Sequence, residues 1–169
     1  MHQSAVDFIC KMQFKSCRIL EKNNKLKSVF ISYSKDDTDY IKAFENHLSF
    51  LDKQINVWWD QDLLAGDDWN KTIESKMKSA DLIIFLISSS LYKTGYIRDI
   101  EIPMALERLG KKEKVKVIPV IIRDCAWEDS EFSKFTALPH KAKAISTWGN
   151  PDTGWKEVVQ GIKKVIAGE

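Results

Sequence analysis

One glutamate, Glu101, is the residue of this sequence best placed for chemistry. It follows a wholly apolar run at residues 82–87 and a short polar segment, and its neighbours Ile100 and Ile102 are apolar. A strand that is apolar on every side is buried on both faces, as in a parallel sheet, and such sheets bind ligands beyond the carboxyl ends of their strands. Carboxylates with perturbed ionisation cluster at functional sites, although some are structural. Glu101 is therefore the first candidate catalytic residue, and an ordinary solvated helix glutamate is the alternative.

Two more polar segments are expected at the same edge. Residues 32–37 read Ser-Tyr-Ser-Lys-Asp-Asp. Their hydroxyls suit a phosphate or a ribose at a helix N-terminus, but plain helix capping by Ser34 or Asp36 explains them as well. Residues 58–69 carry three tryptophans around four aspartates. Aromatic rings there can stack on a base and carboxylates can hold ribose hydroxyls, while the spacing does not match a calcium loop. The pair Leu63-Leu64 indicates a contact surface. The alternative is a core position for Trp58 or Trp69, with Asp67 or Asp68 as a helix cap.

Composition and charge exclude several function classes. The chain has 169 residues, 44% of them hydrophobic and 30% charged, which favours one domain with a sizeable core. A net charge of +2 requires neither a nucleic acid nor a membrane as partner, and no apolar run approaches the roughly 20 residues of a membrane span. Three cysteines without a C-x-x-C pair fit a reducing cytosol, so a cytoplasmic location is expected. No two histidines have metal-ligand spacing.

Strands and helices alternate from residue 28 onward. Apolar runs predict strands at residues 29–33, 55–59, 82–87 and 115–122, with a weak fifth strand at 142–146. Helical spacing predicts helices between them, including one near 98–110 that ends at Gly110, whereas residues 88–98 are expected to form a loop. Pro119 cannot donate to a strand ladder, so its strand is expected at an edge or a bulge. The pattern predicts a three-layer α/β fold, a five-stranded parallel sheet with helices on both faces.

Residues 1–27 differ from this pattern. Their apolar spacing indicates a short amphipathic helix and a linker, which could pack on the domain, mediate self-association or lack order. The domain itself is expected at residues 28–169. It has no G-x-G-x-x-G, no P-loop and no G-x-S-x-G motif, which argues against a Rossmann dinucleotide site, a P-loop NTPase and an α/β-hydrolase.

Five stretches, in order, resemble a Toll/interleukin-receptor (TIR) domain. They are VFISYSKDD, INVWWDQDLLAGDDW, ADLIIFLISSSLYKTGY, DIEIPMAL and KVIPVIIRDCAWEDSEFSKFTALPHKAKAIS, and the resemblance covers residues 28–167. The long tail after the fourth predicted strand is similar to bacterial TIR proteins of antiphage defence. The resemblance implies a flavodoxin-like five-stranded sheet. As in many bacterial and plant members, it also implies cleavage of NAD at the nicotinamide–ribose bond.

The resemblance also implies roles for single residues. Three residues separate the family's catalytic glutamate from an Ala-Leu pair, as they separate Glu101 from Ala105. An aromatic residue usually precedes that glutamate by four positions, whereas Tyr96 precedes Glu101 by five. Tyr33 and Ser34 match first-loop positions that approach the dinucleotide.

The second loop supplies the remaining implied site residues. Asp60 matches an acidic family position at the end of the second strand, and Trp59, like Tyr33 and Tyr96, could flank the nicotinamide or adenine ring. Residues 60–68 correspond to the family's "BB loop", which is used in assembly and in gating the site. An assembly role is therefore implied for Leu63, Leu64 and Gly66.

The predicted function is an NAD glycohydrolase that self-assembles with other TIR domains in antiphage immunity. NAD is its substrate, no metal or cofactor is required, and the product is ADP-ribose or a cyclic ADP-ribose. The sequence leaves open whether a sensor domain or a partner protein outside this chain takes part. The alternative is a non-catalytic TIR–TIR signalling scaffold, in which Glu101 is an ordinary surface or interface charge. A response regulator is disfavoured because the first strand lacks the acidic pair that would bind magnesium.

Overall fold

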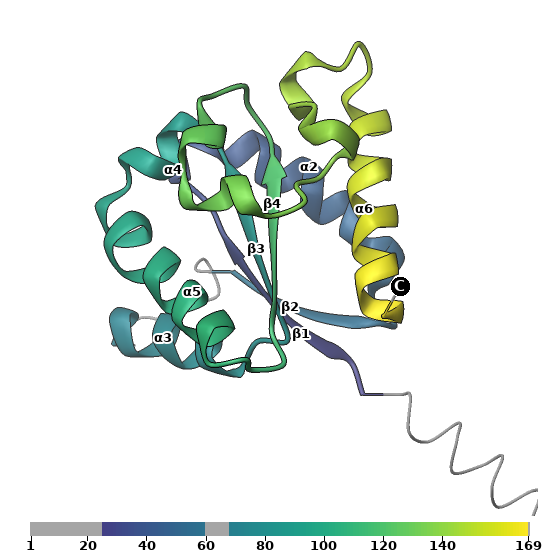
Figure 1. Ribbon diagram of the computed structural model, residues 1–169. Helices are drawn as coiled ribbons and strands as arrows, with labels where there is room; N and C mark the ends of the chain where they lie inside the picture. The colour runs from purple at the N-terminus through teal and green to yellow at the C-terminus, as the bar shows by residue number, and fades with distance from the viewer. Residues whose placement is uncertain (1–24, 60–67, 169) are drawn as a thin grey trace, which may run out of the picture.

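The chain builds a parallel sheet between two layers of helices (Figure 1). The computed structural model describes residues 25–59 and 68–168. The strands are β1 (Lys27–Ser32), β2 (Ile55–Trp58), β3 (Leu82–Ile87) and β4 (Lys116–Ile121). They lie in the order β2-β1-β3-β4, and every pair is parallel. The predicted three-layer α/β architecture is confirmed, and this strand order is flavodoxin-like.

Helices cover both faces of the sheet (Figure 1). The longer ones are α2 (Thr38–Leu48), α3 (Trp69–Ser79), α5 (Ile102–Gly110) and α6 (Pro151–Ala167), and α4 (Ser89–Lys93) is short. Side chains of a strand point alternately to its two faces. Accordingly, Val29 and Ile31 of β1 join the core under α2 and α6, while Phe30 joins the core under α3 and α5. All six residues of β3 are buried, as expected for a strand covered on both sides.

Short helical turns fill the connections. The 3-10 turns are η1 (Lys35–Asp37), η2 (Ser49–Leu51), η5 (Trp127–Asp129), η6 (Glu131–Lys134), η7 (His140–Ala142) and η8 (Ile145–Thr147). A π-helical turn, η4 (Ile97–Glu101), leads directly into α5. The helix predicted near residues 98–110 is therefore present, and it ends at Gly110 as expected. No helix among residues 25–59 and 68–168 is long and apolar enough to span a bilayer.

The last helix, α6, begins and ends at signals that the sequence carries. The Asn150 side chain accepts a hydrogen bond of 3.0 Å from the N–H two residues on, and Pro151 occupies the first turn. Gly168 follows the helix with a φ of 81°, a left-handed conformation that favours glycine. The buried face of the helix packs on α2, where the Trp155 ring stacks on Phe44 at 4.9 Å between centroids.

The fifth strand predicted at residues 142–146 is wrong. Ala142 ends the turn η7, Ile145 begins the turn η8, and the two residues between them belong to no regular element. Lys141 and Ala142 have φ angles of 58° and 52°, in the left-handed region that an extended strand does not use. The apolar residues that suggested a strand, Ala144 and Ile145, are both buried, one in each of the two cores. Their burial follows from tertiary packing, which the local pattern could not distinguish from a strand.

A single residue, Leu138, replaces the missing strand beside β4. Its N–H donates to the Pro119 carbonyl at 2.9 Å, and its carbonyl accepts from the N–H of Ile121 at 2.8 Å. Within the described residues β4 is an edge strand, so the edge position expected from Pro119 is confirmed. The nitrogen of Pro119 lies on the same side of β4 as that of Ile121, away from β3, where the missing N–H leaves the β3–β4 ladder intact.

The loop predicted at residues 88–98 is also corrected, because it contains α4 and the start of η4. The Ser88 hydroxyl caps α4 by accepting a 3.1 Å hydrogen bond from the N–H of Leu91. The three serines at residues 88–90, predicted to lie in a polar loop, therefore also provide the N-cap of α4.

An ion pair between the buried Asp37 and the partly exposed Arg123, whose side chain is 35% exposed, connects the segments that follow β1, β3 and β4. Asp37 is 2% exposed, and its carboxylate lies 2.8 Å from the Nε atom of Arg123. The Ser88 hydroxyl donates to the other carboxylate oxygen at 2.5 Å, and Arg123 also donates to the Ser90 hydroxyl at 2.6 Å. Removing one partner of a buried ion pair leaves an uncompensated charge. This network therefore fixes the carboxyl edge of the sheet.

We expect Arg123→Met to lower the free energy of unfolding by about 3 kcal/mol, because Asp37 then stays buried without its cation. Urea unfolding followed by circular dichroism measures the change. Arg98→Met is the matched control: its pair with Asp99 is exposed, at 52% and 60% of the two side chains, and should contribute less than about 1 kcal/mol. Equal losses in the two variants would contradict a structural role for the buried pair.

Candidate active site

A cavity of about 380 Å³ opens at the carboxyl edge of the sheet, beside the ends of β1 and β3. The chain places β2 on one side of β1 and β3 on the other, so the winding direction reverses between β1 and β3. Open α/β sheets bind ligands at this topological switch point. The cavity is lined by the end of β1 and the loop after it, by α4 and η4, and by the first residue of α3.

Glu101 contributes a carboxylate to this cavity although only 5% of the residue is exposed. Ser32, at the end of β1, is 3% exposed and donates its hydroxyl hydrogen to Oε2 of Glu101 at 2.5 Å. The prediction that this glutamate lies just past a strand end is confirmed, and the alternative of a solvated helix glutamate is wrong. The carboxylate is buried, hydrogen-bonded and in contact with a cavity, an arrangement typical of functional carboxylates.

Two aromatic rings form another part of the cavity wall. The rings of Tyr96 and Trp69 lie 4.4 Å apart between centroids, tilted by 53°. Burial, and then the charge of Glu101, raise the pKa of Tyr96 above its usual value, so the phenol stays neutral at physiological pH. Its hydroxyl is buried and has no hydrogen-bond partner among the residues that the structure describes. The wall thus offers aromatic surface to a ligand.

The comparisons with known proteins agree with this architecture. A family model described as "TIR domain" matches residues 29–158. The chain belongs to the TIR family. It is 33% identical over 141 residues to the uncharacterized protein y4lF of Sinorhizobium fredii (strain NBRC 101917 / NGR234); the match covers 82% of this chain and 43% of that protein. The chain therefore spans less than half of that relative's length.

A solved structure also shows the TIR fold. The TIR domain of the Toll-related receptor TRR-2 from Hydra magnipapillata has a TM-score of 0.53 and 17% sequence identity, covering 80% of this chain and 97% of that one. At this identity the likeness shows the fold alone.

The π-helical turn of this TIR domain accounts for the spacing between Tyr96 and Glu101. The N–H of Ile102 donates to the carbonyl of Ile97, five residues earlier, which is the π-helical pattern. In an α-helix, residues four apart share a face, and the wider π turn brings residues five apart to one face. Both Tyr96 and Glu101 line the cavity. Tyr96 therefore takes the position that a spacing of four gives in a regular helix.

The first loop of the TIR domain brings two more predicted site residues to the cavity, Tyr33 and Ser34. Ser34 is 3% exposed, and its hydroxyl accepts from the N–H of Asp36 at 3.3 Å, which confirms its capping role. Lys35 from this loop and Lys93 from α4 also line the cavity. These two exposed lysines balance the charges of the two carboxylates that line the cavity, Glu101 and the exposed Asp36.

One described residue of the predicted site, Trp59, does not line the cavity. Trp59 is 6% exposed and packs edge-on against Phe44 at 6.4 Å, in the core under α2. Its contact with the lining is through Tyr33, whose ring centroid lies 6.4 Å from that of Trp59. The remaining residues, Asp60, Leu63, Leu64 and Gly66, lie outside the described residues.

Sequence reasoning missed Ser32 and Trp69 as site residues. Ser32 is the polar end of an apolar strand, and that position was the available signal. Trp69 begins α3 directly after its cap, where the Asp68 side chain accepts from the N–H of Lys71 at 3.3 Å. The alternative that places Trp69 in the core is wrong, because 40% of this residue is exposed.

Metal ligation has no support in the part of the chain that the structure describes. No group of three or more His, Cys, Asp or Glu residues there is arranged to hold a metal ion. The chemistry that the described cavity can perform rests on a carboxylate, hydroxyls, lysines and aromatic rings.

We expect deletion of Arg98 to convert η4 into an α-helical turn without moving Glu101. Arg98 is exposed, and its removal restores four-residue spacing while both ends of the turn stay in place. The melting temperature should then stay within about 3 °C of the wild type. Deletion of the exposed Lys42 in the regular helix α2 is the control, because it rotates the following residues by roughly 100° and should cost more than about 10 °C. A similar loss in both variants would show that η4 is not a one-residue insertion.

Proposed function

We propose that this TIR domain is an NAD glycohydrolase that cleaves the nicotinamide–ribose bond. The observation that carries the proposal is the buried Glu101 carboxylate, which accepts from Ser32 and lines a cavity at the switch point of the sheet. NAD acts as substrate, and the reaction needs no metal.

The charges around the cavity complement those of NAD. The nicotinamide ring carries a positive charge that the Glu101 carboxylate attracts, and the diphosphate carries negative charges that Lys35 and Lys93 attract. The paired rings of Tyr96 and Trp69 offer a stacking surface for a flat heterocycle. A cavity of about 380 Å³ is within the range of small-molecule sites.

Bond cleavage places positive charge where Glu101 can stabilise it. As the bond from ribose C1′ to the nicotinamide nitrogen breaks, its electron pair moves to the nitrogen and neutralises the ring. The ribose becomes an oxocarbenium-like cation, and carboxylates meet comparable cations in glycosidases. Glu101 holds the ribose hydroxyls and stabilises this charge in a site with little water. Attack by water, with loss of one proton, gives ADP-ribose, and attack by a nucleophile of the substrate itself gives a cyclic product.

The proposed biological setting is bacterial antiphage defence in the cytoplasm, with activity controlled by self-association. The long segment after β4, residues 122–150, supports this setting because it is similar to bacterial TIR proteins. A sensor domain or a partner protein would supply the trigger.

We expect Glu101→Gln to reduce nicotinamide release from NAD at least about 100-fold, because the neutral amide cannot stabilise the cation. Concentrated protein is incubated with NAD, and chromatography with mass spectrometry quantifies nicotinamide, ADP-ribose and cyclic products. Circular dichroism confirms that the variant is folded. Asp39→Asn is the control: it removes an exposed carboxylate of α2 that does not line the cavity, and it should retain full activity. Wild-type turnover by a folded Glu101→Gln protein would refute the assignment.

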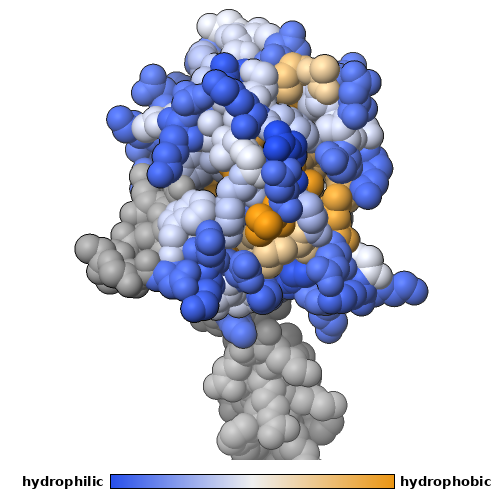
Figure 2. Space-filling view, turned by 90° about the vertical axis from the view of Figure 1, so that its left-hand side faces the viewer, coloured by the Kyte–Doolittle hydropathy of each residue, from blue (hydrophilic) through white to orange (hydrophobic). Residues whose placement is uncertain are grey.

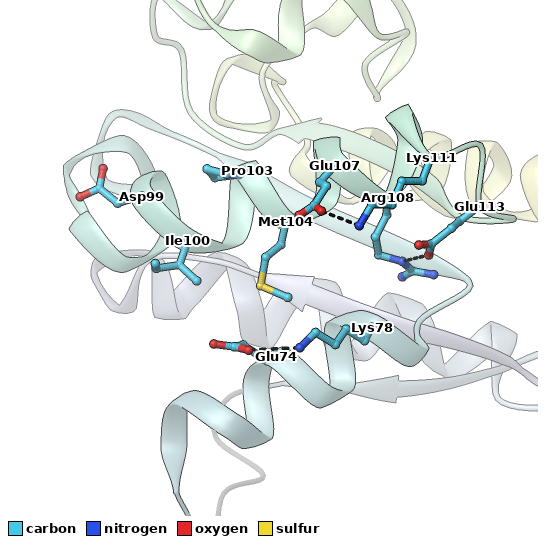
Figure 3. Close-up of a pocket in the computed structure, with 10 residues that line it drawn as sticks. All are labelled: Glu74, Lys78, Asp99, Ile100, Pro103, Met104, Glu107, Arg108, Lys111 and Glu113. Atoms are coloured by element: carbon cyan, nitrogen blue, oxygen red, sulfur yellow. Dashed lines mark hydrogen bonds and ion pairs between the residues drawn. The ribbon is translucent and has the colours of Figure 1, made fainter.

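A second candidate function, association with other TIR domains, is favoured by a groove between α3 and α5. The groove has a volume of about 600 Å³. Figure 2 shows apolar atoms at the surface amid charged side chains on this side of the molecule. In Figure 3 the Met104 side chain extends from α5 toward Glu74 and Lys78 of α3. Ile100 at the groove is 39% exposed. The charged side chains at the rim of the groove neutralise one another in ion pairs, which include Glu107–Lys111 and Arg108–Glu113 (Figure 3).

If this groove mediates assembly, Ile100→Glu should abolish concentration-dependent association, because it places a charge in an apolar contact. Sedimentation velocity over a range of protein concentrations measures the change. Phe50→Glu is the matched control, since Phe50 is 73% exposed on η2, which follows α2 on the opposite face of the sheet. Association that persists in Ile100→Glu, or is lost equally in both variants, would exclude the groove as the interface.

A further inference from the structure

We propose that Ser32 is a positioning residue that holds the Glu101 carboxylate in its reactive orientation. This inference rests on the proposed NAD cleavage. Its basis is the hydrogen bond from the Ser32 hydroxyl to Oε2 of Glu101, 2.5 Å long, between two residues that are 3% and 5% exposed. Ser32 acts through Glu101.

The two ends of this hydrogen bond differ in backbone support. Ser32 is the last residue of β1 and is paired in register with Phe85 of β3, so its backbone is fixed by the sheet. Glu101 lies at the end of a π-helical turn and carries its carboxylate on a long side chain with several rotatable bonds. A hydroxyl on a rigid strand therefore selects one orientation of a flexible acid. Sites supported in this way hold reacting groups within the narrow limits that catalysis needs.

The same hydrogen bond favours the ionised carboxylate, because a donor stabilises the charged form more than the neutral acid. Several other titratable groups lie around the same cavity. Tyr33, Lys35 and Asp36 line the cavity from the first loop, Lys93 lines it from α4, and Tyr96 precedes η4; Glu74 and Asp68 of the α3 region act on Tyr96. These groups remain in place when Ser32 is changed. A change in the titration of Glu101 on loss of the hydroxyl therefore reports on the hydrogen bond itself.

The chain offers a closely matched control in Ser88. Its hydroxyl also donates at 2.5 Å to a buried carboxylate, that of Asp37, and Ser88 is 0% exposed. Neither Ser88 nor Asp37 lines the cavity. Replacing either serine by alanine removes one donor from a buried carboxylate. Ser88→Ala also removes the cap of α4, so it should lose at least as much stability as Ser32→Ala. Only the loss of Ser32 should alter the chemistry at Glu101.

The test compares nicotinamide release by the full chain and its Ser32→Ala, Ser32→Thr and Ser88→Ala variants across pH. Ser32→Ala should lower kcat about 10- to 100-fold with KM changed less than about twofold, because a misplaced group costs rate more than binding. The acidic limb of its kcat profile should move upward by about one pH unit, since loss of the donor raises the pKa of Glu101. Ser32→Thr retains the hydroxyl and should restore most of kcat and the wild-type limb. Ser88→Ala should keep both near wild type.

A measurement without turnover separates this inference from the proposed function. The side-chain carboxyl carbon of Glu101 is followed by ¹³C NMR through a pH titration, with its signal assigned from the Glu101→Gln variant. An upward shift of its midpoint in Ser32→Ala but not in Ser88→Ala supports the positioning role even if wild-type protein does not cleave NAD, a result that would refute only the glycohydrolase. Equal kcat profiles and equal NMR midpoints in wild type, Ser32→Ala and Ser88→Ala would overturn the role of Ser32. If Ser32→Thr does not fold, Ser32→Cys, which has similar volume and a weak donor, should behave like Ser32→Ala.

Discussion

The parallel pairing of β1 with β3 is the constraint on which the rest of the site depends. Parallel strands end at the same edge of a sheet, so this pairing brings the segments after β1 and β3 together although they are far apart in the sequence. The pairing also requires burial on both faces, which the apolar strands and the two helical layers provide. The winding reverses between these two strands, so the helices that follow them diverge and leave the cavity between their first turns.

Two buried carboxylates at this edge have different surroundings and therefore different roles. Asp37 has a guanidinium at 2.8 Å and a serine hydroxyl, and it joins three segments of the chain. Glu101 accepts from the neutral hydroxyl of Ser32 and lines the cavity. A carboxylate neutralised by an adjacent cation is a structural element, and it attracts a further positive charge only weakly. Glu101 lines the cavity and Asp37 does not, which favours Glu101 as the reacting group.

The sequence predicted the parts of the fold that depend on local periodicity. The apolar pattern placed β3 correctly, and Gly110 marked the end of α5. Pro119 correctly indicated an edge strand. The pattern failed where packing decides. Ala144 and Ile145 are apolar because they enter the two cores, and the left-handed Lys141 prevents a strand before them. A period-two signal of only a few residues does not distinguish these cases.

The candidate site was predictable in its position but less so in its contacts. Strand-end logic identified Glu101, and the resemblance added Tyr33, Ser34 and Tyr96. The hydrogen bond to Ser32 joins residues 69 positions apart, and no local pattern encodes it. The positions of Trp59 and Trp69 were also not encoded in the local sequence pattern. Trp59 is buried in the core and Trp69 lies against Tyr96, because each ring follows the face of the element that carries it.

The two candidate functions depend on one structural element, the π-helical turn η4. Its residues divide between two surfaces: Ile97 and Glu101 line the cavity, whereas Asp99 and Ile100 line the groove between α3 and α5. A turn with an inserted residue has fewer regular hydrogen bonds to hold its geometry than an α-helix has. A partner bound in the groove would contact the residue next to Glu101 and stabilise one conformation of the turn. The two proposed functions are therefore physically compatible, since a conformation of the turn selected by a partner would also fix the Glu101 carboxylate.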